Sequence, residues 1–252
     1  MTFNELYNSL NQLYPVSLRC EWDNDGIMCV DNGEREVKRV LISLDVTMDT
    51  VNYAIENGYD TIISHHPLVF RSQKALTPVS FTQNKLIQLI KSGIGVMSFH
   101  TRLDAAKNGV NDTLASFLGI EGVVVDEIDP IGRIGYLPCK MELSAFAKNV
   151  KESLNSPFVL YSGKNMAHKV YLVGGDGKDL IENAIANGCD TIVTGRGSYN
   201  TSVDACDMGI NIVEAGHFYT ENPVCVTLKD EILKIDNSIE ASIYNSNKIN
   251  MV

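Results

Sequence analysis

The 252-residue chain lacks long hydrophobic runs, paired cysteines and an excess of positive charge. No apolar run approaches the ~18 residues of a membrane-spanning helix, so we expect no membrane partner. Residues 1–10 have neither a basic start nor an apolar centre, and so they do not resemble a signal peptide. The six cysteines form no CxxC pair, which favours free thiols in a cytoplasmic protein over a thiolate zinc site.

Basic residues are outnumbered, with 21 Lys and Arg against 31 Asp and Glu, for a net charge of −10. Such a chain repels a phosphate backbone on average, which argues against nucleic acid as a partner. Hydrophobic residues make up 44% and charged residues 21% of the chain, values that are typical of a globular protein.

Histidine is also scarce, but its placement is informative, because four of the five histidines stand in three short motifs. These motifs are His65-His66-Pro67, His100 followed by Asp104, and His217 followed by Glu221. The fifth, His168, is interpreted as an ordinary hydrogen-bonding residue.

An internal repeat indicates two halves of similar design. The string AIENGYDTIIS at residues 54–64 recurs as AIANGCDTIVT at residues 184–194. An acidic, turn-like stretch at 126–132 places the boundary there. We therefore predict an N-terminal lobe, residues 1–126, with the HHP and HTxLD motifs, and a C-terminal lobe, residues 127–252, with the GHxxTE motif.

The hydrophobic periodicity predicts strands that alternate with helices. Strands are expected at 37–44, 61–64, 94–99, 158–161, 169–173, 190–194 and 210–213, and helices at 47–57, 81–92, 109–118, 143–154, 178–187 and 220–233. This order predicts an α/β protein of two pseudo-symmetric three-layer lobes with mostly parallel sheets.

The histidine motifs follow predicted strands, and ligands in α/β sheets gather beyond the carboxyl ends of the strands. Imidazole and carboxylate groups bind Zn, Mn, Fe, Co or Ni. Adjacent residues of an extended chain point in different directions, so His65 and His66 suit two metal ions. The sequence thus predicts one metal centre, built by both lobes in the cleft between them.

Two further segments allow two interpretations each. The glycine run 174–177 fits either a tight turn or a phosphate-binding loop, with the turn favoured. Residues 194–200 occupy the repeat position that corresponds to the HHP motif, and there Arg196 fits either an anion site or a surface loop.

Read together, the WDNxG motif at 22–26, SHHPL at 64–68, HTxLD at 100–104 and GHxxTE at 216–221 resemble the GTP cyclohydrolase 1 type 2 family. The resemblance covers nearly the whole chain. It implies a dinuclear site with metal ligands at His65, His66, Asp104, His217 and Glu221, and with His100 beside them. It also implies a toroidal homohexamer. The chain departs from the family pattern at Arg196 and Asn200, where an acidic residue and a histidine are common.

The function that the resemblance implies is hydrolytic opening of the guanine ring of GTP, with release of formate. Two divalent cations would activate the attacking water, and His100 is the candidate proton shuttle. Arg102 or Lys107 is a candidate contact for the triphosphate. The alternatives are a non-catalytic metal carrier or interaction scaffold and a two-metal phosphoesterase.

Overall fold

The computed structural model describes residues 1–164 and 166–250, and their contacts divide the chain into two compact units. Unit 1 contains Met1–Ala106 and Cys225–Asn250, and unit 2 contains Lys107–Val224. The sequence places a single division at 126/127, whereas these contacts divide the chain at 106/107 and again at 224/225. The chain returns to unit 1 because β11 (Glu240–Ile243) pairs in parallel with β2 (Arg39–Ser43).

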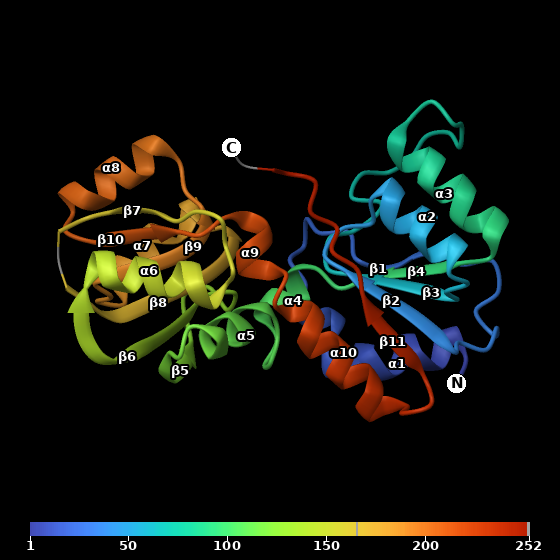
Figure 1. The fold of residues 1–252 in the computed structure, drawn as a ribbon, viewed down its shortest axis with the longest axis horizontal. Helices are drawn as coiled ribbons and strands as arrows, with labels where there is room; N and C mark the ends of the chain where they lie inside the picture. Colours follow the sequence, from blue (N-terminus) through green and yellow to red (C-terminus); the bar gives the residue numbers. More distant parts are fainter. Residues whose placement is uncertain (165, 251–252) are drawn as a thin grey trace. The chain divides into compact units, whose positions relative to one another are not determined.

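The sheet of unit 1 has the strand order β1-β4-β3-β2-β11. Its pairs are parallel except for β1 with β4, as the sequence predicts for a mostly parallel sheet. Helices α2 and α3 cover one face, and α1 and α10 lie on the other (Figure 1). The bounds are β1 (Gly26–Cys29), β3 (Thr61–Ser64), β4 (Gly95–Ser98), α1 (Phe3–Leu13), α2 (Met48–Glu56), α3 (Phe81–Ser92) and α10 (Val224–Ile235).

Strand alternation explains the two covered faces of this sheet. Leu41, Ile62 and Val96 are fully buried in the cluster that also holds Val51 of α2 and Leu89 of α3. Their neighbours along the strands point to the opposite face, because successive side chains of a strand alternate. A fully buried sheet of this kind reads as a continuous apolar run, which is why the sequence reveals these strands clearly.

The sheet of unit 2 has the order β5-β6-β8-β9-β10-β7 and is mixed. Among the described residues, the pairs β8–β9 and β9–β10 are parallel, and β5–β6, β6–β8 and β7–β10 are antiparallel. It is therefore not the mostly parallel sheet expected, because β5 and β6 add an antiparallel hairpin that the sequence pattern did not reveal. The bounds are β5 (Glu121–Val125), β6 (Arg133–Glu142), β7 (Leu160–Ser162), β8 (Met166–Asp176), β9 (Thr191–Arg196) and β10 (Asn211–Glu214).

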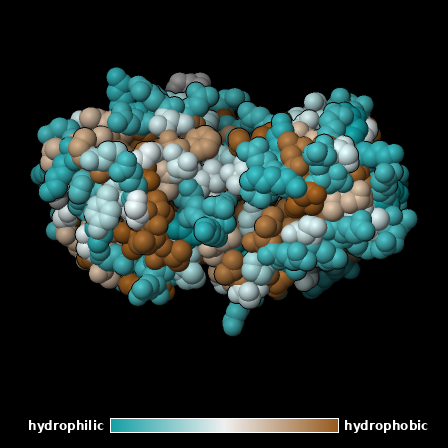
Figure 2. Space-filling view, turned by 90° about the horizontal axis from the view of Figure 1, so that it is seen from below, coloured by the Kyte–Doolittle hydropathy of each residue, from teal (hydrophilic) through white to brown (hydrophobic). Residues whose placement is uncertain are grey.

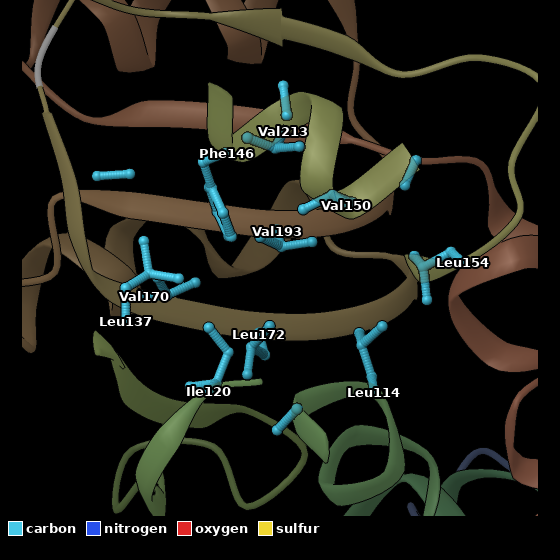
Figure 3. Close-up of a cluster of buried hydrophobic side chains, with 14 of the residues drawn as sticks. Leu114, Ile120, Leu137, Phe146, Val150, Leu154, Val170, Leu172, Val193 and Val213 are labelled. Atoms are coloured by element: carbon cyan, nitrogen blue, oxygen red, sulfur yellow. The ribbon is translucent and has the colours of Figure 1, made fainter. Parts of the chain in front are cut away.

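Unit 2 also has three layers, with a hydrophobic cluster on each face of its sheet. One cluster joins Val170, Leu172 and Val193 to Phe146 and Val150 of α6 (Figure 3). The alternate strand residues, such as Tyr171 and Ile192, pack with α7 and α8 in the other cluster. The bounds are α5 (Val110–Phe117), α6 (Leu143–Ser153), α7 (Ile181–Ala186) and α8 (Tyr199–Asp207), with a 3-10 turn at Lys178–Leu180. A second 3-10 turn, Val16–Leu18, belongs to unit 1.

The internal repeat has the same local structure in both units. Gly58 and Gly188 follow α2 and α7 with φ of 65° and 64°, a conformation that favours glycine. The Asp60 carboxylate accepts hydrogen bonds from the backbone N–H groups of Lys38 and Arg39. Asp190 accepts the corresponding bonds from the backbone N–H groups of His168 and Lys169 on the neighbouring strand β8. Each copy therefore ends a helix and fixes the register of the next strand.

The surface carries apolar groups in patches that polar residues interrupt, as the face in Figure 2 shows for both units. Within residues 1–164 and 166–250, no helix combines the length and the apolar character needed to cross a membrane.

Candidate metal centre

Three histidines of unit 1 meet beyond the ends of two neighbouring strands. His65 and His66 follow β3, and His100 follows β4 after Phe99. The two strands pair in parallel up to Ser64 and Ser98, so their carboxyl ends lie side by side. One ligand nitrogen from each histidine lies within 4.8 Å of the other two. The convergence that the sequence predicts for these three residues is therefore present.

Each of the three imidazoles is oriented through its Nδ1 atom. His65 Nδ1 lies 2.9 Å from the carbonyl oxygen of Phe99, to which it must donate. His66 Nδ1 lies 2.7 Å from Oδ1 of Asp45, and His100 Nδ1 lies 2.8 Å from Oδ1 of Asp23. A proton on Nδ1 leaves the lone pair on Nε2, which is the arrangement of metal-binding histidines.

A carboxylate joins this group from the short helix α4 (Thr101–Ala105). Oδ1 of Asp104 lies 3.6 Å from Nε2 of His65. His65 is fully buried and Asp104 is only 8% exposed. A negative charge beside buried imidazole nitrogens favours a cation there, because burial strengthens the attraction.

The WDNxG loop positions His100 and the start of α4. Asp23 accepts hydrogen bonds from the His100 ring, from Thr101 N at 3.1 Å and from Thr101 Oγ1 at 2.6 Å. Burial acts to raise the pKa of Asp23, but the hydrogen bonds from His100 and Thr101 outweigh it and lower the pKa to about 2. Asp23 is thus an ionised partner that orients His100, a role that was not predicted from the sequence.

Asp45 holds His66 and is itself held by the C-terminal segment. Ser246 donates to Oδ2 of Asp45 at 3.3 Å, and its hydroxyl oxygen accepts from the backbone N–H of Asp45 at 3.1 Å. Neither residue was predicted from the sequence. A signal for Asp45 existed, since it lies just after a strand end, as His65 does. Ser246 carried no such signal because its contact depends on a segment 201 residues away in the chain.

Unit 2 presents a histidine and a carboxylate one helical turn apart. His217 and Glu221 lie on the short helix α9 (His217–Glu221), with His217 Nε2 at 3.0 Å from Glu221 Oε2. The Glu221 side chain is 6% exposed and that of His217 is 45% exposed. The motif thus places both ligand types on one helix face, as their spacing predicts.

The glycine run of unit 2 makes room for this carboxylate. Gly175 has φ of 68°, and a Cβ there would collide with Oε1 of Glu221. A Cβ on Gly174 would lie 3.2 Å from Cγ of Glu221. Strand β8 extends through both glycines, so they serve close approach to α9. The sequence allowed either a tight turn or a phosphate-binding loop at these glycines, and neither explains why Gly174 and Gly175 are glycines.

Arg102 is fully buried, which contradicts its suggested contact with triphosphate. Its Nε donates to Asp25 at 2.8 Å, and its NH1 group donates to Asn11 Oδ1 at 2.6 Å. The guanidinium also lies over the ring of Phe99, 4.6 Å from its centroid. Arg102 therefore joins α1, the WDNxG loop and α4. In unit 2, Arg196 and Asn200 are exposed.

Neutral imidazoles with a neighbouring carboxylate fit a divalent transition metal, because these are the ligands that Zn, Fe, Mn, Co and Ni accept. His65, His66 and His100 each have a hydrogen-bonding partner on Nδ1, which is a second feature of such metal sites. His168, by contrast, lies on β8 with its ring 5.6 Å from that of Tyr136.

The fold and these residues define a two-unit α/β protein with a histidine-rich candidate metal centre. The chain belongs to the Duf34/NIF3 (NGG1p interacting factor 3) family, whose pattern it matches over residues 1–250. This membership confirms the resemblance seen in the sequence motifs.

Named relatives and solved structures agree with this assignment. The chain is 33% identical over 249 residues to the GTP cyclohydrolase 1 type 2 homolog of Clostridium perfringens, covering 95% of both chains. It is 34% identical to the protein of the same name from Clostridium acetobutylicum, covering 90% of this chain and 88% of that protein. The crystal structure of a Bacillus cereus protein related to NIF3 has the same fold, with a TM-score of 0.92, 24% identity and coverage of 100% and 99%.

Proposed function

We propose that this protein is a metal-dependent hydrolase that binds two divalent cations. The ligands in this proposal are His65, His66 and Asp104 of unit 1 with His217 and Glu221 of unit 2. The observation that carries it is the convergence of the unit 1 imidazoles, whose Nδ1 atoms are all held by acceptors. Two cations at these residues would activate water and polarise the group under attack.

The proposed reaction is the hydrolytic opening of the guanine ring of GTP, with release of formate. The names of the clostridial relatives support this choice of substrate. The chain's own contribution is to orient the imidazoles through Asp23, Asp45 and the Phe99 carbonyl. Orientation of this kind fixes the reacting groups before the substrate arrives.

His100 is the proposed proton-transfer residue. Its Nδ1 is held by Asp23, so Nε2 is the atom that would accept and return a proton. The same atom is close enough to His65 and His66 to bind a metal ion. Metal content separates the two roles: His100→Ala retains its ions and loses turnover if His100 transfers protons, and it loses an ion if His100 is a ligand.

The direct test is formate release from GTP by protein loaded with each of Zn, Fe, Mn, Co and Ni. We expect turnover with at least one metal and its loss in His65→Ala and Glu221→Ala. His168→Ala is the matched control, because it removes a histidine outside these groups, and it retains activity. A fully metallated protein that releases no formate contradicts the cyclohydrolase proposal, and hydrolysis of a phosphoester by that sample would support a two-metal phosphoesterase instead.

A metal carrier is the second candidate, favoured by the 45% exposure of the His217 side chain. An exposed ligand can be exchanged for an acceptor's ligand more readily than a buried one. Transfer of the ions to a chelating acceptor distinguishes the candidates: a carrier releases them within the mixing time, and the proposed enzyme retains them through many turnovers.

We also propose that the chain assembles into a ring-shaped homohexamer. Light scattering coupled to size exclusion tests this directly, and a monomeric mass at micromolar concentration would contradict it.

A further inference from the structure

Two exposed aromatic side chains stand beside His100 and have no role in the hydrophobic core. Trp22, the only tryptophan of the chain, is 65% exposed, and Phe70 is 46% exposed. Exposing such large apolar rings is unfavourable by roughly 25 cal/mol per Å². A pair of them next to candidate metal ligands therefore suggests a binding role.

The three rings form a corner, with their planes at steep angles to one another. The centroids of Trp22, Phe70 and His100 are each 6.2 Å from the other two. The planes meet at 65° for Trp22 and Phe70, 77° for Trp22 and His100, and 89° for Phe70 and His100. A planar ligand stacked on one of these rings lies parallel to that ring, and its plane therefore meets the planes of the other two rings at a steep angle. This is the edge-to-face geometry that aromatic pairs favour.

The corner is held in place although the rings of Trp22 and Phe70 are exposed. The Asn24 side chain donates a hydrogen bond to the carbonyl oxygen of Val69, which ties the Trp22 loop to the Phe70 loop. Behind Trp22, the backbone N–H of Asp23 donates to Cys20 O, and Cys20 N donates to Thr101 Oγ1. A preorganised surface loses less conformational freedom on binding.

We infer that Trp22 and Phe70 form a stacking site for a planar heteroaromatic ring of nucleobase size, presented to His100. This inference rests on the proposed function and deepens it, because it assigns recognition of the ring to these two side chains. Arg102, which is buried, takes no part in it.

Trp22 fluorescence tests the inference directly, since no other tryptophan contributes. The metal-loaded protein is titrated with GTP, guanosine and inorganic tripolyphosphate, with excitation at the red edge of the indole band. We expect saturable quenching by GTP and guanosine but not by tripolyphosphate. Absence of quenching by both guanine compounds at millimolar concentration would overturn the inference.

Variants separate stacking from general exposure of aromatic rings. Phe70→Leu is expected to weaken guanosine binding, whereas Phe117→Leu, which changes a phenylalanine 43% exposed on α5, leaves it unchanged. By calorimetry, Trp22→Ala weakens binding roughly 5- to 150-fold, the range that corresponds to the stacking of one base, and Trp22→Phe restores part of it. Equal affinities in all four variants would refute the site.

The outcome is distinguishable from failure of the hydrolase proposal. Guanosine binding without formate release contradicts the hydrolase and supports the stacking site. Formate release with an unchanged KM in Trp22→Ala contradicts the stacking site alone. If Trp22→Ala and Phe70→Leu instead reduce the molecular mass in solution, the corner is a contact between copies of this chain, and the inference is wrong.

Discussion

Replacing Asp23 with asparagine tests how the WDNxG loop supports the candidate metal centre. The substitution keeps the shape of the side chain but replaces an acceptor oxygen with a donor. Asp23 accepts from the His100 ring, Thr101 N and Thr101 Oγ1, so an amide group must face at least one of these donors. We therefore expect the stability of the metal-free protein to fall.

The magnitude follows from the pKa of Asp23, which the folded protein lowers from 3.8 to about 2. At about 1.4 kcal/mol per pKa unit, the ionised carboxylate stabilises the metal-free fold by about 2 kcal/mol at neutral pH. A lowered pKa gives stability that is present above 3.8 and lost as the pH falls toward about 2. The difference between wild type and Asp23→Asn is thus expected to shrink to about half at about pH 3.

Urea unfolding of the metal-free proteins at neutral pH and at about pH 3 measures this difference. Metal affinity, measured by competition with a chelator, is expected to stay unchanged if His100 transfers protons, and to fall by about 10- to 100-fold only if His100 is itself a ligand. Asp207→Asn is the control, because Asp207 is an exposed carboxylate at the end of α8. An unchanged stability in Asp23→Asn would refute the reasoning.

Three further predictions concern other parts of the molecule. Gly175→Ala should lower the free energy of unfolding by more than Gly209→Ala does. Both glycines have positive φ, but only Gly175 lies against Glu221. Equal losses of stability in urea unfolding would contradict this contact. Ser246→Ala should weaken metal affinity by less than Asp45→Ala, since Ser246 acts through Asp45, and chelator competition ranks the two. Asp126→Asn should destabilise the protein at neutral pH: burial acts to raise the pKa of Asp126, but hydrogen bonds from Ile128, Tyr171 and asparagine side chains lower it on balance. The loss should diminish as acidification protonates the wild-type carboxylate, and a loss that grows in acid would be inconsistent with this sign.

The sequence reveals the buried parallel strands well. Strand 61–64 and helix 81–92 have the predicted bounds, because an apolar β-branched run and a Ser80 cap with Gly93 at the end are strong local signals. By contrast, β6 was not predicted, since its burial pattern alternates weakly along Arg133–Glu142. β11 was missed because its place depends on pairing with β2, far away in the sequence.

The convergence of the three unit 1 histidines could be predicted from the sequence, because they follow strands that end at one edge of the same sheet. The residues that orient them could not be predicted in the same way. Asp23 contacts His100 across 77 residues, and Asp45 contacts His66 across 21. Such contacts arise only when the loops fold against the strand ends. The burial of Arg102 likewise depends on α1, which supplies Asn11 as its partner.

The most direct test of the central claim is the number of divalent ions per chain in protein purified without chelators. The proposal predicts about two ions per chain, and a reduced count in both His66→Ala and His217→Ala, because both residues are among its proposed ligands. His168→Ala should retain the full count. A correctly folded wild-type protein that takes up no divalent ion, even after incubation with Zn, Fe, Mn, Co and Ni, would contradict the account.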